Sequence, residues 1–532
     1  MTDLASFNLL KDAWIPVADS SGRIAEGSIM DVLTNAHNLA GISDPSPVVE
    51  FGLYRFLVAF VMDAFSVDDF DAIESLLDKG IFAPETLRMY VEEIGLSRFD
   101  LFNCTTPFYQ VDEEAAEKLR VVSVAALMRH LPAGSFATHF HHVKEEDQAW
   151  SPAVCARALV SIPAFMTAGG RGYSPSVNGN PPWYVLVLGE NLFTTIVLNC
   201  CGLDIPGLRG SNPPAWRSGT QIVGERRRCN SLLEGLTWQP RRIRLIPSEG
   251  GTCTYTGRES SMLVRNMSFG PGLMFEGEWT DPQVAYMITK NGATPLRAQG
   301  DKEIWRDVGP LMLLREHDYE GGKGKQKVRF ARPAVVNQFL ILRDERVISA
   351  SESLSVQVYG IRTDGKMKLY EWAREKLSLQ AEIAQRPIAA ATVQSNIESA
   401  ELVAYYLDDA IKRIYPEEGK RNKRAFKTLQ WRAQRRYWAD LYPVFEKDFL
   451  SVLVTGDVED ADFIDDMRYQ WTVSAIRQAT EVFNWIASPL EVDADSMERV
   501  AKARICLNRK AAYSLKWLSG TMQKKIAGGD QS

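Results

Sequence analysis

The residue pattern of this chain changes near residue 385. Before that point, glycine and proline pairs such as Pro213-Pro214 and Gly250-Gly251 interrupt short mixed segments. After it, apolar residues recur at helical spacing, as in Val403–Ile414. Glycine and proline end regular elements, whereas a sustained period of about 3.6 residues requires an uninterrupted helix. The sequence therefore predicts an α+β protein, with a large mixed domain over residues 1–385 and an all-α domain over residues 386–532.

Four helices are expected in the second domain. They extend over Val403–Ile414, Ala425–Leu450, Ile464–Ile486 and 496–519. The third stops before Pro489, which cannot continue a helix. Helices of this kind joined by short connections are typical of a four-helix bundle.

The first domain mixes helices and strands. Long apolar runs predict helices over Val48–Phe65 and Ala153–Phe165. Three shorter apolar runs, Tyr184–Leu188, Thr194–Leu198 and Val335–Leu342, lie between turn signals and predict strands.

Charge and composition limit the class of function. The 532 residues include 61 lysines and arginines against 67 acids, for a net charge of −6. A polycationic coat for nucleic acid is excluded, so any such contact must come from local patches or from partners. No apolar run approaches the ~20 residues of a membrane span. No export signal opens the chain, and its seven cysteines show no CxxC spacing. We therefore expect a cytoplasmic protein that does not act at a membrane.

The strongest local concentration of charge is basic. Between Ile411 and Asp440, ten lysines and arginines face three acids, and Trp431, Tyr437 and Trp438 lie among them. This pattern fits a solvated helix face with core aromatics, and it equally fits a surface that follows a phosphate backbone. The second interpretation assigns DNA contact to Lys420, Arg421, Lys423, Arg424, Lys427, Arg432, Arg435 and Arg436. A smaller basic patch is predicted in the first domain from Arg226, Arg227, Arg228, Arg241, Arg242 and Arg244.

Signals for catalysis are weak. His139, His141 and His142 are half of the six histidines, but no cysteine or carboxylate spacing completes a metal site with them. No nucleophile elbow, metalloprotease helix or dinucleotide-binding glycine motif occurs. We expect no catalysis, no metal, no cofactor and no small-molecule substrate. A metal-dependent hydrolase that uses the histidine cluster is the alternative.

A run of glycines, Ala168–Gly172, interrupts the first domain. Glycine tolerates positive φ and lets the backbone approach another molecule closely, and Arg171 adds a charge to the run. A simple turn has the same composition.

Several short segments, in order through the first ~385 residues, carry a family resemblance. They are Phe7–Leu10 with Asp12 and Trp14–Val17, Pro107-Phe108 with Gln110, Ala168–Gly172, Gly235-Leu236 with Trp238–Pro240 and Ile243, and Ala334–Phe339. With the helical tail that follows, they resemble the large subunit of the type I-E CRISPR Cascade complex, the CasA family.

The resemblance implies a subunit without catalysis that reads a short motif beside the target (the PAM) from the minor groove. Such a subunit helps to open the duplex so that guide RNA can pair, and it supports recruitment of a helicase–nuclease. The implied partners are double-stranded DNA, guide RNA, the other Cascade subunits and the helicase–nuclease. A scaffold that binds only proteins through its helices is the second alternative.

The resemblance also implies roles for particular residues. Gly169, Gly170, Arg171 and Gly172 correspond to the PAM loop. Phe140, His141, His142 and Lys144 fall in a loop that in relatives reaches toward the guide-RNA handle and the PAM.

At two further sites, this chain lacks the residue type that has a role in the family. The wedge hairpin of relatives corresponds to Thr363, Asp364, Gly365 and Lys366, where Asp-Gly is a favoured turn but the family's glutamine is absent. The family's minor-groove lysine falls within Arg265–Gly272, a stretch without lysine, so Arg265 is the candidate cation.

Overall fold

The computed structural model describes residues 6–128, 148–169, 172–205, 208, 210–218, 226–298, 302–313, 317–321, 326–349, 353–363, 369–414 and 420–529. Within these ranges, the side chains of 317–321, 326–328, 363, 369–370, 420–425 and 516–529 are not described.

The chain forms two compact units. Unit 1 is Met1–Gly300 with Arg315–Ser378, and unit 2 is Asp301–Leu314 with Leu379–Ser532. The segment Asp301–Leu314 thus packs with the C-terminal helices, although it precedes them by more than sixty residues. The residue pattern does not reveal that this segment belongs to unit 2, because the chain returns to unit 1 after it.

The strands described in unit 1 form five sheets. Strands that are adjacent in the following orders are hydrogen-bonded to each other. Two of the sheets are β2 (Ile24–Gly27), β1 (Ile15–Asp19) and β3 (Leu39–Ile42), and β11 (Gly292–Pro295), β10 (Tyr286–Thr289), β13 (Gln326–Ala331) and β12 (His317–Gly321). The other three are β15 (Leu369–Leu379), β14 (Leu354–Thr363) and β5 (Tyr184–Val187); β4 (Arg120–Ser123), β8 (Glu259–Pro271) and β7 (Arg241–Thr252); and β6 (Arg226–Arg227) with β9 (Met274–Phe275).

Helices alternate with these strands along the chain. In unit 1 they are α1 (Ile29–Thr34), α2 (Pro47–Ala64), α3 (Phe70–Lys79), α4 (Pro84–Ile94), α5 (Glu113–Glu117), α6 (Pro152–Phe165), α7 (Leu192–Asn199), α8 (Ala215–Ser218), α9 (Leu232–Leu236) and α10 (Ala334–Asp344). The helices predicted over Val48–Phe65 and Ala153–Phe165 are α2 and α6. Both begin with proline at the first helical positions, where the missing N–H costs no hydrogen bond.

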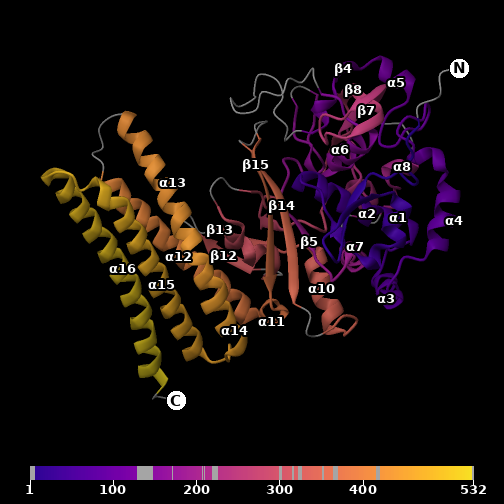
Figure 1. Cartoon of the computed structure of the whole chain (residues 1–532). Coiled ribbons are helices and arrows are strands. Elements are labelled where there is room, and N and C mark those ends of the chain that lie inside the picture. The colour runs from indigo at the N-terminus through magenta and orange to yellow at the C-terminus, as the bar shows by residue number, and fades with distance from the viewer. Residues whose placement is uncertain are drawn as a thin grey trace. The chain divides into compact units, whose positions relative to one another are not determined.

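Helix α2 is the centre of unit 1 and packs against α6 and α7 (Figure 1). It is apolar on every side, so it is buried almost throughout. Its one buried cation, Arg55, lies 2.8 Å from the equally buried Asp281 and also donates to Gln283 and to the Leu236 carbonyl. A buried charge is tolerated only when it is paired and hydrogen-bonded, and Arg55 meets both conditions.

Two of the three predicted strands are wrong. Tyr184–Leu188 contains β5, but Thr194–Leu198 lies in α7 and Val335–Leu342 lies in α10. Both helices are buried on nearly all sides, so their sequences lack the polar face that gives helical periodicity. The local start signal of α7 is Asn191, whose side chain accepts a hydrogen bond from the Thr194 N–H.

Unit 2 is built from helices and from the short helical turns of Asp301–Leu314. The helices are α11 (Ala381–Gln385), α12 (Pro387–Ile414), α13 (Lys420–Pro443), α14 (Ser451–Thr455), α15 (Ala461–Ala487) and α16 (Ala494–Gly529). The four long ones, α12, α13, α15 and α16, run side by side (Figure 1). After Pro443, which has no N–H to donate, the α-helical pattern changes to a π-helical stretch over Val444–Leu450. No helix among the described residues has the length and apolar character that a bilayer crossing requires.

Candidate nucleic-acid interface

Strand β8 contains Arg265 and contacts residues that flank two of the predicted loops. Strand β4, which ends shortly before the 129–147 segment, pairs with β8 from Arg120 opposite Phe269 to Ser123 opposite Asn266. After that segment, Trp150 forms a bridge with Val264, through N–H to carbonyl hydrogen bonds of 2.9 and 2.7 Å. Both ends of the segment are therefore tied to neighbouring positions of one strand. The segment itself contains Phe140, His141, His142 and Lys144, which lie outside the described residues.

Arg265 occupies a β-bulge on this strand. In the antiparallel pairing of β7 with β8, Ile246 lies opposite Asn266 and Pro247 lies opposite Val264, so Arg265 has no counterpart in β7. A bulge interrupts the alternation of side chains, and Arg265 and Asn266 are both exposed in succession. Proline suits this position because the broken ladder demands no N–H there. The bulge therefore turns a cation outward between the two ends of the 129–147 segment.

The glycine run lies beside the other end of β8. Tyr173, which follows the run, stacks on Phe269 with ring centroids 5.9 Å apart, and its carbonyl accepts from the Gly169 N–H at 3.1 Å. Gly172 has φ +86°, and a Cβ there would meet no atom of the described residues within 4 Å. The backbone conformation thus favours glycine at this position. Gly170 and Arg171 lie outside the described residues.

Arg241 holds both flanks of the glycine run. Its guanidinium donates to the carbonyl of Thr167 at 2.6 Å and to the carbonyl of Ser174, and it lies 5.2 Å from the Tyr173 ring centroid. Its side chain is buried. Arg244, from the same predicted basic patch, is also buried and donates to the Asn103 carbonyl. The prediction of a surface patch is therefore wrong for these two arginines.

Sequence reasoning missed the role of Arg241, although a signal was present. In a strand, residues 241, 243 and 245 share one face, and Ile243 and Leu245 are apolar. The alternation of side chains in a strand thus predicts that Arg241 points inward, whereas the local concentration of cations predicts a surface position.

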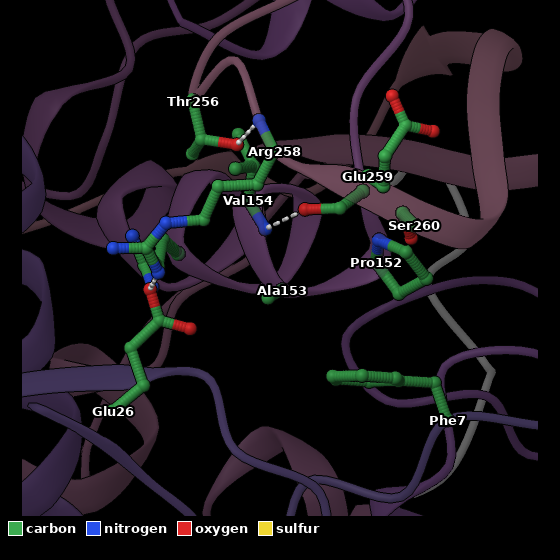
Figure 2. Close-up of a pocket in the computed structure, with 11 residues that line it drawn as sticks. Phe7, Glu26, Pro152, Ala153, Val154, Thr256, Arg258, Glu259 and Ser260 are labelled. Carbon is green, nitrogen blue, oxygen red and sulfur yellow. Dashed lines mark hydrogen bonds and ion pairs between the residues drawn. The ribbon is translucent and has the colours of Figure 1, made fainter. Parts of the chain in front are cut away.

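A pocket of about 180 Å³ lies where α6 and β8 begin (Figure 2). At its edge, Glu26 accepts from Arg157 at 2.7 Å and from Arg258 at 3.0 Å. Ser151 caps α6 by accepting from the Val154 N–H. Arg157 also lies 3.7 Å from the buried Asp44, so two carboxylates face the two arginines, and these contacts fix the chain as it leaves the 129–147 segment.

The base of the predicted wedge hairpin is hydrogen-bonded to helix α2. Strands β14 and β15 are hydrogen-bonded neighbours joined by residues 364–368. The buried Glu50 of α2 contacts both strands, since it accepts from the Tyr359 hydroxyl at 2.6 Å and from the Arg374 guanidinium. Thr363 ends β14, while Asp364, Gly365 and Lys366 lie outside the described residues.

Gly360 lets this base pack closely. A Cβ at Gly360 would lie 2.2 Å from the Trp183 ring, so only glycine permits β14 to approach that indole. Burial raises the pKa of the Glu50 carboxyl above its ordinary value of 4.5, although its hydrogen bonds with Tyr359 and Arg374 act in the opposite direction.

The predicted basic patch of unit 2 is partly a surface. Lys427, Arg432, Arg435 and Arg436 are exposed on α13. Lys420, Arg421, Lys423 and Arg424 also lie on α13, but their side chains are not described. Of the three aromatic residues in this segment, Tyr437 and Trp438 are buried and Trp431 is exposed. The core interpretation thus holds for two of them.

The histidines of the hydrolase alternative, His139, His141 and His142, lie outside the described residues. In the part of the chain that the structure describes, no three or more His, Cys, Asp or Glu side chains are grouped so that they could hold a metal ion.

Comparison with known proteins identifies the family from the sequence, and solved structures share the fold. The family model of CRISPR-associated protein Cse1 matches residues 8–482. The CRISPR-associated protein CasA/Cse1 of Thermus thermophilus is 29% identical over 437 residues, which are 79% of either chain.

Solved structures share the architecture. Thermobifida fusca Cse1 matches with a TM-score of 0.75 at 20% identity, over 97% of this chain and 99% of that one. A chain of a CRISPR RNA-guided surveillance complex matches with a TM-score of 0.70 at 18% identity, over 94% and 99%. The class is thus that of mixed helix-and-sheet proteins with the Cse1 fold. The chain belongs to the CRISPR-associated protein Cse1 family, which confirms the CasA-family resemblance of its sequence.

Proposed function

We propose that this chain is the DNA-recognition subunit of a type I-E CRISPR Cascade complex and has no catalytic activity of its own. In this role it reads the PAM from the minor groove, helps to open the target duplex for guide-RNA pairing, and supports recruitment of the helicase–nuclease. The observation that carries the proposal is the gathering of three elements along β8: both ends of the 129–147 segment, the base of the glycine loop, and the bulged Arg265.

The chemistry of this cluster suits the minor groove. A narrow groove admits backbone and single extended side chains better than a helix, and arginine is a usual minor-groove cation. Gly169 and Gly172 supply a side-chain-free approach, and Arg265 supplies the charge. The minor groove separates A·T from G·C and little more, so we expect tolerance of several related PAMs. Discrimination of the full target belongs to guide pairing.

The hairpin base supports the role in strand opening. A wedge must resist the force needed to unstack base pairs, so it requires a rigid mount. Glu50 and Trp183 provide this mount for β14 and β15. We assign the wedge to Thr363–Lys366, in which Lys366 or Thr363 serves in place of the glutamine of relatives.

The proposal extends to the two domains, the partners and the cellular location. Residues 1–385 serve PAM recognition and docking in the complex, and α12, α13, α15 and α16 form the C-terminal four-helix bundle of residues 386–532. Partners are the DNA target, guide RNA, sister subunits and the helicase–nuclease, which places the protein in the cytoplasm with the invading DNA. The relative from a CRISPR RNA-guided surveillance complex supports assembly with subunits and RNA.

The test is PAM-dependent binding by a complex reconstituted with its sister subunits and guide RNA. Replacing Arg265→Ala should weaken binding of a target that carries its PAM by about tenfold, because one good base contact is worth ~1–3 kcal/mol. Binding of a target without a PAM should change little. Arg88→Ala is the matched control, since Arg88 is an exposed arginine on α4. Equal losses for both targets, or for both variants, would refute the assignment of Arg265.

A further inference from the structure

Among the described side chains of unit 2, two tryptophans are exposed. Trp431 on α13 is 43% exposed and Trp485 on α15 is 38% exposed. An indole in water lacks the stabilisation that burial gives, so exposed indoles indicate a surface that becomes covered in use. Tyr437 and Trp438, in contrast, are buried in the same unit.

Three arginines lie over these two rings. The guanidinium carbons of Arg432 and Arg436 are 5.1 and 4.4 Å from the Trp485 ring centroid, and that of Arg435 is 5.4 Å from the Trp431 ring centroid. A guanidinium over a ring uses its flat face for that contact and keeps its N–H groups in the plane, free to meet a phosphate. We call these five side chains the Trp–Arg platform.

The charge on the platform is only partly balanced. Arg436 pairs with Asp440 at 3.3 Å, and both side chains are about half exposed, so solvent weakens this pair. Glu481, one turn before Trp485 on α15, is the other exposed acid close in sequence to these residues. Against these two acids stand the three platform arginines and Lys427, which leaves an excess of positive charge.

Flat faces combined with cations match one chemical class of ligand. Single-stranded DNA offers unpaired bases that stack on aromatic rings or on guanidinium planes, together with phosphates at every residue. In a duplex, each base face is already covered by the next pair, so the rings of the platform gain nothing from it. A patch that used charge alone would bind both forms through phosphate and would need no exposed indole.

We propose that the Trp–Arg platform binds single-stranded DNA. Unpaired bases stack on the guanidinium planes that Trp485 and Trp431 support and on the indole surface that remains exposed, while the N–H groups of the three arginines hold the phosphates. This inference rests on the proposed function in one respect only: opening of the target duplex supplies the unpaired strand.

The test separates bases from phosphates. Binding of the full chain is measured by fluorescence anisotropy with a labelled thymidine oligonucleotide and with an abasic strand of the same length and charge. The wild-type chain should bind the thymidine strand about five- to tenfold more tightly. Trp485→Ala should weaken this preference, and the double variant Trp431→Ala/Trp485→Ala should remove it, while affinity for the abasic strand stays unchanged in both. Trp485→Phe, which keeps a ring, should retain more of the preference than Trp485→Ala.

Tyr405→Ala is the matched control. Tyr405 is an exposed aromatic residue of unit 2 that also lies beside a cation, Lys510, but Asp409 already pairs with that lysine at 2.9 Å. Its removal should leave both affinities unchanged.

Three outcomes overturn the inference: no preference for the thymidine strand in the wild-type chain, equal weakening of both strands by Trp485→Ala, or a preference that survives the double variant Trp431→Ala/Trp485→Ala. Any of these would make the surface a docking site for protein or a purely ionic patch. The proposed function stands apart from these results, because PAM preference of the complex depends on β8 and should persist in the Trp485→Ala variant.

Discussion

Arg241 shows how one side chain can control a loop that it does not belong to. Its guanidinium holds carbonyls on both sides of the glycine run, at Thr167 and Ser174, and covers the Tyr173 ring. Each hydrogen bond from a charged donor is worth ~1.5–3 kcal/mol net, and the planar fork reaches two carbonyls at once. We therefore regard Arg241 as a positioning residue for the glycine loop.

Arg241→Lys should separate positioning from stability. The lysine keeps the charge but cannot span two carbonyls, so the loop loses one of its flanks. We expect the ratio of complex affinities for targets with and without a PAM to fall about tenfold, since the loss of one such hydrogen bond, at ~1.5 kcal/mol, corresponds to roughly that factor. Affinity for the target without a PAM should stay the same. A folded variant with an unchanged ratio would show that Arg241 is only structural.

At the scale of elements, one buried acid of helix α2 contacts both strands of the hairpin β14–β15. Glu50 contacts one residue in each strand, Tyr359 and Arg374. Because its pKa is raised in the folded protein, the folded state binds this proton more tightly than the unfolded chain does. The corresponding stability is fully present below pH 4.5 and is lost as pH rises through the folded-state pKa.

This linkage predicts how Glu50→Gln behaves with pH. The glutamine does not titrate, so the free energy of unfolding of the wild type relative to the variant should increase as pH falls from 7 toward 4.5. Urea denaturation at several pH values measures this difference. A difference that is constant, or that decreases on acidification, would mean that burial does not govern the Glu50 carboxyl.

The same scale shows what sequence pattern can and cannot predict. Amphipathic helices such as α12 and α15 are evident because their polar faces mark the period. Helices α7 and α10 are buried nearly all round, so their runs are equally consistent with strands. Pro247 is the one sign in the sequence of the bulge at Arg265. The bulge itself could not be predicted, because it is a property of how two strands pair.

In the whole molecule, any positively charged patch that binds DNA must do so although the net charge of the chain is negative. A net charge of −6 repels DNA at long range, so the isolated chain should bind duplex weakly and with strong salt dependence. Family membership could be predicted from short segments spread over unit 1. The return of Asp301–Leu314 to unit 2 could not, because it depends on contacts between residues far apart in the chain.

The most direct test of the β8 interface is a crosslink from residue 265. Arg265 is replaced by a photoreactive amino acid in the reconstituted complex, which is then irradiated with a guide-matched target duplex. We predict crosslinks to the PAM base pairs, and none when the same photoreactive residue replaces Arg88. Crosslinks only to sister subunits or guide RNA, from a complex that still binds its target, would contradict the account.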